Sequence, residues 1–118
     1  MNRPRKAFMV YLDLDPLPGL MHTPEEALSH LSEILQNFFR PYKPMVTLAP
    51  MKAQLPPSVE ARTRKAYVVY LDMDPVPGVM HVADNARFML ERVLTSVITT
   101  YDPKVHHAPD EFQPKEGN

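Results

Sequence analysis

The chain of 118 residues contains no cysteine, and this absence excludes disulfides, thiolate metal sites and thiol nucleophiles. An excess of one charge is also missing. The formal net charge is −1, so the composition predicts no overall attraction to nucleic acid or to an anionic membrane. Long hydrophobic runs are absent as well: the apolar stretch at residues 7–12 ends at Asp13. It is too short for a signal-peptide core or a membrane span, so we expect a cytoplasmic protein.

The chain contains two copies of one unit. Residues 5–50 and 64–109 align without a gap at a constant offset of 59, and 21 of the 46 paired positions are identical. Two copies of a small unit usually bury a shared face against each other. We therefore predict a single domain over residues 1–109, with a linker at residues 51–63 and a disordered tail at residues 110–118.

Each copy has the pattern of a β-α-β unit. Alternating apolar residues at 7–14 and 66–73 predict two central strands, since neither run contains proline. A turn rich in proline and an apolar pattern with helical spacing follow each of them. A Tyr-x-Pro-x-Val sequence then predicts short strands at 45–48 and 104–107, and its proline favours the edges of a sheet.

This order of elements predicts an α+β, ferredoxin-like βαββαβ fold, in which a four-stranded antiparallel sheet carries both helices on one face. A rival arrangement exchanges two β-α-β units between the chains of an obligate dimer. The first helix has a capping box at Thr23 and Glu26. In the second copy Val82 replaces the threonine, so we expect Asp84 to cap a helix that begins slightly later.

Alternation divides the central strands into two faces. The face predicted to pack under the helices is apolar throughout: Phe8, Val10, Leu12, Leu14, Tyr67, Val69, Leu71 and Met73. The opposite face carries Met9, Tyr11, Val68 and Tyr70 at its middle, and with helices on one side only we expect these four to form an open interaction surface. Two such faces packing back to back would make a homodimer, and an unrelated protein could dock there instead.

Single-stranded nucleic acid stacking on Tyr11 and Tyr70 is a further alternative for this face. The four aspartates on the same face disfavour it, because they repel phosphates. We therefore expect no nucleic-acid partner and no membrane partner.

Two equivalent loops carry the only candidate chemistry. Each has an Asp-x-Asp pair followed by a histidine, and the candidate metal ligands are Asp13, Asp15, His22, Asp72, Asp74 and His81. Two carboxylates and an imidazole could hold a divalent cation or act in acid–base chemistry. The same residues are typical of a turn that is held by its own hydrogen bonds, which we favour. In the predicted fold the two loops lie at opposite ends of the sheet and cannot pool their ligands.

The segment Y-L-D-[LM]-D-P-x-P-G-x-M-H at residues 11–22 and 70–81 resembles one in small uncharacterised actinobacteriophage (mycobacteriophage) proteins. The resemblance implies expression in the cytoplasm of an infected host and no particular activity. Small phage proteins of this kind often bind a host or phage protein. No Gly-rich phosphate loop, G-x-S-x-G or H-E-x-x-H motif occurs. We predict a non-enzymatic, self-associating protein-binding module without a cofactor, and the alternative is a metal-binding protein or metal-dependent enzyme.

Overall fold

The computed structural model describes residues 4–54 and 64–114, which form one four-stranded sheet with two helices. The strands are β1 (Arg5–Asp13), β2 (Met45–Leu48), β3 (Arg64–Asp72) and β4 (Lys104–His107), and the helices are α1 (Pro24–Phe39) and α2 (Ala83–Val97). Four single-turn 3₁₀ helices are η1 (Arg40–Tyr42), η2 (Met51–Ala53), η3 (Thr99–Tyr101) and η4 (Asp110–Phe112). The sheet order is β2-β3-β1-β4 with every neighbouring pair antiparallel, which confirms the predicted ferredoxin-like βαββαβ fold.

A pseudo-two-fold axis passes through the centre of the β1–β3 pair. Met9 lies opposite Val68, which is its own counterpart at the repeat offset of 59. The register therefore places each end of β1 beside the opposite end of β3, with Arg5 opposite Asp72 and Asp13 opposite Arg64. As expected, the loops that follow β1 and β3 lie at opposite ends of the sheet.

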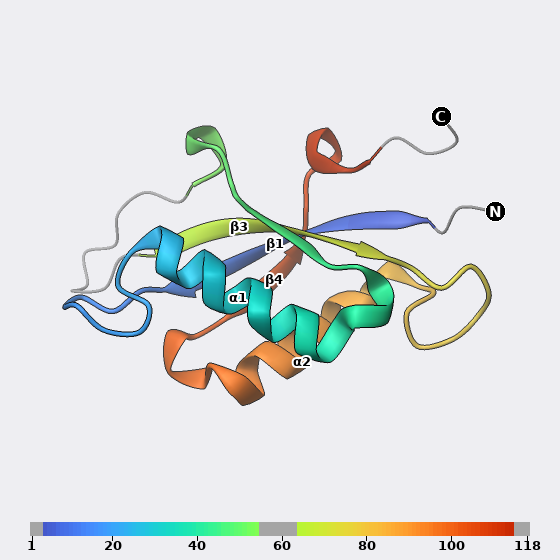
Figure 1. The fold of residues 1–118 in the computed structure, drawn as a ribbon. Coiled ribbons are helices and arrows are strands. Elements are labelled where there is room, and N and C mark those ends of the chain that lie inside the picture. The colour runs from blue at the N-terminus through green and yellow to red at the C-terminus, as the bar shows by residue number, and fades with distance from the viewer. Residues whose placement is uncertain (1–3, 55–63, 115–118) are drawn as a thin grey trace.

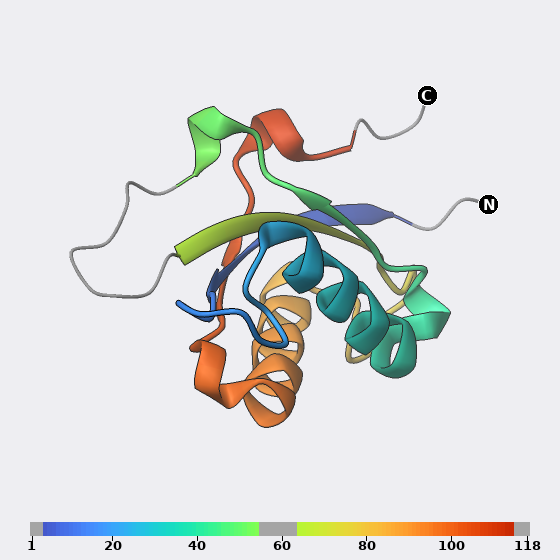
Figure 2. The ribbon, with the colours of Figure 1, turned by 60° about the vertical axis from the view of Figure 1, so that its left-hand side comes forward.

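Both helices cover the same face of the sheet (Figures 1 and 2). All eight residues predicted to face them are at most 2% exposed, so the alternation of the two central strands is confirmed. Burying a large apolar side chain in this way contributes about 1.5–3 kcal/mol. Tyr67 carries the one hydroxyl on this face, and it donates a hydrogen bond to the carbonyl oxygen of Pro24 (2.9 Å).

The two helices begin at equivalent residues but are capped differently. Thr23 accepts from the backbone N–H of Glu26, and Glu26 accepts from that of Thr23, which is the predicted capping box. Val82 is the N-cap of α2 and provides no side-chain hydrogen bond. The prediction that Asp84 caps a later start is wrong. Its carboxylate instead pairs with His107 Nε2 on β4 (2.6 Å), because β4 runs beside the first turn of α2.

The reverse face is partly covered by the chain itself, which differs from the open surface expected. After each edge strand the backbone turns over this face through η2 or η4, above the sheet in Figures 1 and 2. We call residues 49–54 and 108–113 the return segments. They pack Ala53 and Phe112 with Met9 and Val68, which are only 2% and 1% exposed.

A glutamine anchors each return segment. Gln54 donates to the carbonyl oxygens of Ala49 and Ala66 (both 2.9 Å) and accepts from the N–H of Ala66 (2.8 Å). Gln113 makes the equivalent three hydrogen bonds to Ala7 and Ala108. The segment expected to be a disordered tail is therefore ordered from residue 110 to 114, while residues 115–118 lie outside the described part of the chain.

Candidate functional site

The first aspartate of each loop forms an ion pair across the two central strands. Arg64 Nη1 lies 2.6 Å from Asp13 Oδ1, and Arg5 Nη1 lies 2.6 Å from Asp72 Oδ1. These pairs follow from the antiparallel register, since each strand begins with arginine and ends with aspartate. All four side chains are largely buried, so the carboxylates neutralise guanidinium groups that have lost much of their water.

The second aspartate holds its own turn. Asp15 Oδ2 accepts from the backbone N–H of Met21 and from the hydroxyl of Tyr101, both at 3.0 Å. Asp74 Oδ2 accepts from the N–H of Met80 (3.3 Å) in the equivalent turn. A Cβ at Gly19 would lie 3.2 Å from Asp15 Oδ2, so a larger residue would require the carboxylate to shift by a few tenths of an ångström.

The two histidines also bond to the loops. His22 Nδ1 donates to the backbone oxygen of Asp15 (2.8 Å), and His81 Nδ1 donates to that of Asp74 (2.9 Å). A carbonyl oxygen can only accept, so Nδ1 carries the proton in each ring. Within residues 4–54 and 64–114, no three histidine or carboxylate side chains are grouped as metal ligands. The structure thus places all six candidate ligands in contacts that hold the fold.

The four residues predicted to form an open surface divide into two kinds. Met9 and Val68 are buried under the return segments, whereas Tyr11 and Tyr70 are half-buried on either side of them. The ring of Tyr11 meets that of His106 edge-on, with centroids 5.6 Å apart. The middle of this face is therefore closed, because the return segments occupy it.

A hollow of about 350 Å³ beside Tyr11 is lined by Arg64, Lys104 and His106. The counterparts of these three residues at the other end of the sheet are Arg5, Met45 and Thr47. The basic residues Lys104 and His106 of this hollow are therefore replaced by uncharged residues at the other end of the sheet.

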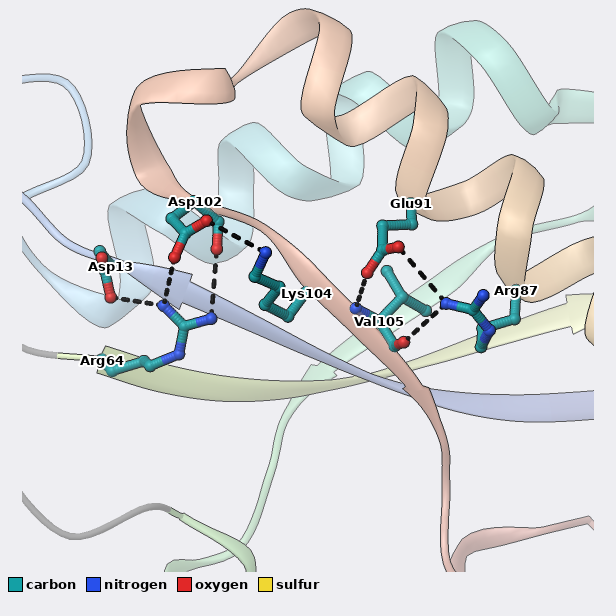
Figure 3. A network of polar contacts seen from close by, with 7 residues as sticks. All are labelled: Asp13, Arg64, Arg87, Glu91, Asp102, Lys104 and Val105. Carbon is teal, nitrogen blue, oxygen red and sulfur yellow. Dashed lines mark hydrogen bonds and ion pairs between the residues drawn. The ribbon is translucent and has the colours of Figure 1, made fainter.

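Carboxylates balance the charge in this hollow (Figure 3). Besides Asp13, Arg64 contacts Asp102 through its carboxylate (3.7 Å) and its backbone oxygen (3.2 Å). Lys104 Nζ lies 3.5 Å from the same carboxylate. Asp102 occupies a left-handed backbone conformation (φ 45°), as does its counterpart Lys43 (φ 46°). That turn presents the carboxylate and carbonyl of Asp102 to Arg64.

The outer side of β4 is closed by two side chains of α2 (Figure 3). Glu91 Oε1 accepts from the N–H of Val105 (2.9 Å), and Arg87 Nη1 donates to the carbonyl oxygen of Val105 (3.1 Å). Arg87 and Glu91 also pair with each other at 3.4 Å. These contacts satisfy backbone groups that an edge strand otherwise offers to another chain.

The outer side of β2 lacks this closure within the strand, although Gln36 Nε2 of α1 donates to the carbonyl oxygen of Pro44 just before it (3.1 Å). The counterparts of Arg87 and Glu91 on α1 are Leu28 and Ser32, neither of which bears a charge. Within the part of the chain that the structure describes, no side chain hydrogen-bonds to the backbone of Val46, the counterpart of Val105. We call the outward side of Met45–Leu48 the β2 edge.

Sequence reasoning did not identify the β2 edge as a site. The signal was present in the comparison of the two copies, where leucine and serine replace an i,i+4 Arg–Glu pair. Its meaning depends on which helix face lies over which strand, and only the structure shows this.

No family model, no curated protein and no solved structure matches this chain. Among the described residues, no helix combines the length and the apolar character needed to cross a bilayer. The function is therefore inferred from the geometry of the chain alone.

Proposed function

We propose that this protein is a non-enzymatic module that binds another polypeptide in extended conformation along its β2 edge. One observation carries the proposal: α2 closes the outward backbone of β4 with Arg87 and Glu91, while α1 leaves the equivalent backbone of β2 uncovered among the described residues. An extended chain that adds to an open sheet edge gains main-chain hydrogen bonds.

The side chains along the β2 edge suit such a partner. Met45 and Leu48 are 55% and 43% exposed on opposite sides of the strand, so an added strand would bury apolar surface on both sides. No charged residue occurs within the strand itself. The acidic and histidine side chains of the two loops serve the fold, which supports a binding role over a catalytic one.

A peptide selection tests this proposal. A random library of displayed octapeptides is panned against the full chain, and selected peptides are measured against three proteins. We expect binding to the wild type, loss in Leu28→Arg/Ser32→Glu, which copies the α2 closure onto α1, and retention in Ser29→Arg/Asn37→Glu. The last variant adds the same charges at exposed positions of α1. Peptides that bind the first two proteins equally, or a library that returns no binder, would contradict the proposal.

The hollow beside Tyr11 favours a second candidate, the binding of single-stranded nucleic acid. A base would stack on Tyr11 while Lys104 and His106 approach the backbone phosphates. The carboxylates of Asp13 and Asp102 oppose this, since they already balance Arg64. Filter binding of a labelled oligonucleotide at low salt tests it: retention that Tyr11→Ala removes would support this candidate, and no retention would dismiss it.

A further inference from the structure

We infer that the partner at the β2 edge is a second copy of this chain, joined by antiparallel pairing of β2 with β2 about a two-fold axis at Thr47. The inference rests on the proposed function and names its partner. It makes a continuous eight-stranded sheet from two copies of the four-stranded sheet seen here.

The direction of the backbone groups follows from one hydrogen bond. Ala49 donates from its N–H to Ala66 on β3 (3.0 Å), so its backbone points into the sheet. Backbone groups alternate along an antiparallel strand, and those of Val46 and Leu48 therefore point outward. The second repeat of the same chain confirms this alternation. There the N–H of Ala108 bonds inward to Ala7 (3.2 Å), while the N–H of Val105 bonds outward to α2.

Two prolines select the register. With Thr47 opposite its equivalent, Val46 pairs with Leu48 of the second copy in hydrogen-bonded positions, and Pro44 lies opposite Pro50 beyond the ladder. Moving the register by two residues places Pro44 opposite Leu48, or Val46 opposite Pro50. Proline has no N–H, so either shift leaves the carbonyl oxygen of Leu48 or of Val46 without a donor. The register centred on Thr47 is the one in which both the N–H and the carbonyl of Val46 and Leu48 are paired.

The composition of the strand favours pairing with itself. Two-fold pairing places like residues near each other, and a charged strand would repel its own copy. Met45–Leu48 contains no charge, whereas the equivalent β4 contains Lys104 and two histidines. The neighbouring side of α1 is also uncharged at Leu28 and Ser32, the counterparts of Arg87 and Glu91.

Sedimentation equilibrium over a wide concentration range tests the assembly with the full chain. We expect a monomer–dimer equilibrium in the wild type and in Ser29→Arg/Asn37→Glu. In Leu28→Arg/Ser32→Glu the dissociation constant should rise by about 100-fold or more, because the added side chains occupy the backbone of Val46 and add charge to the interface. Circular dichroism and the melting temperature verify that each variant is folded.

The opposite exchange, Arg87→Leu/Glu91→Ser, opens β4 and leaves each chain with two uncovered edges. We expect this variant to form species larger than a dimer, since each chain can then pair on both sides. A wild type that is monomeric at every concentration would overturn the inference, and so would a dimer that persists unchanged in Leu28→Arg/Ser32→Glu.

Single cysteines test the register, and the chain has none of its own. Thr47 would face its equivalent in a non-hydrogen-bonded pair, where Cα atoms are about 4.5 Å apart and a disulfide is feasible. We expect Thr47→Cys to form a disulfide-linked dimer under mild oxidation and Met45→Cys to remain unlinked. Equal linking of the two variants, or linking of Met45→Cys alone, would contradict the register.

The failure of this inference and that of the proposed function are distinguishable. A monomeric protein that binds selected octapeptides at β2 keeps the proposed function and refutes the second copy. If neither peptide binding nor self-association changes in Leu28→Arg/Ser32→Glu, both the proposed function and the second copy are refuted.

Discussion

Val82 does not cap its helix, whereas Thr23, its counterpart in the first repeat, does. Thr23 caps α1, whereas Val82 leaves the first backbone N–H groups of α2 without a side-chain acceptor. We expect Val82→Thr to accept from the N–H of Asn85 and to raise the free energy of unfolding by about 1 kcal/mol. Urea denaturation measures this change.

The reverse substitution is the matched control. Thr23→Val should lower the free energy of unfolding by about the same amount, because it removes the capping box from α1. An unchanged stability in both variants would show that the helix starts are held by packing and not by their caps.

The buried hydroxyl of Tyr67 should make the stability of the protein depend on pH. Burial, with a smaller effect of the Glu25 charge, raises the pKa of Tyr67 above its ordinary value of 10.0. Above that pH the unfolded chain releases the proton while the folded chain retains it, so stability falls as pH rises. At about pH 9 we expect Tyr67→Phe to be less stable by about 1 kcal/mol through loss of the bond to Pro24, and at about pH 11 this deficit should shrink.

Urea denaturation of both proteins at the two pH values checks this expectation. A deficit that does not change with pH would show that Tyr67 titrates alike in the folded and unfolded chains. Phe8, the counterpart of Tyr67, already demonstrates that phenylalanine fits an equivalent position of the sheet.

Side-chain direction was predictable residue by residue, but pairing between strands was not. Alternation correctly placed Phe8, Val10 and their counterparts in the core. The same alternation placed Asp13 and Asp15 on one face, which suggested a metal site. The register instead pairs Asp13 with Arg64, and Asp15 hydrogen-bonds within its own turn. Nothing in a single strand specifies the residue that lies opposite it.

The return segments are the elements that the sequence analysis did not recognise. Their short motif, Ala-Pro-x-x-x-Gln, occurs at residues 49–54 and 108–113. The alignment stops at the proline because the next three residues share no identity, and one glutamine beyond them carries little statistical weight. Its importance becomes visible only when its amide is seen to bond both to its own return segment at Ala49 and to β3 at Ala66.

Gln113 should therefore be important for closure of the reverse face. We expect Gln113→Ala to lower the free energy of unfolding by about 1–3 kcal/mol, because three hydrogen bonds are lost and the N–H of Ala7 loses its partner. Gln113→Glu has the same shape but cannot donate to the two carbonyl oxygens, so it should destabilise as well. Hydrogen exchange at Ala7 and urea denaturation measure the effect, and full stability in both variants would contradict the anchoring role.

Across the whole molecule, the two copies have diverged where they meet and where they face solvent. Lys52 and Glu111 are counterparts in the repeat, yet they form an ion pair with each other (2.7 Å) between the return segments. Two identical residues could not do so. The difference between the edges of β2 and β4 is of the same kind. A repeat predicts what the halves share, and the differences between them become interpretable once the fold places the counterparts.

The pseudo-symmetry makes a strong prediction about connectivity. Nine residues separate Gln54 from Arg64, and joining Asn118 directly to Met1 would place nine residues between Gln113 and Arg5. By the pseudo-two-fold relation Gln113 and Arg5 are placed relative to each other as Gln54 and Arg64 are, so a connection of the same length should join them. A circular permutant opened between Pro57 and Ser58 should therefore fold to the same sheet, with a melting temperature within about 5 °C of the wild type.

A second permutant, opened between Pro18 and Gly19, is the control. The cut lies inside the turn that Asp15 holds through Met21, so we expect a larger loss of stability. Circular dichroism and thermal melting compare the two with the wild type. Failure of the first permutant to fold, or equal stability of the two, would mean that the halves are not interchangeable. The sheet would then depend on the order in which its copies are connected, and not only on the axis through Met9 and Val68.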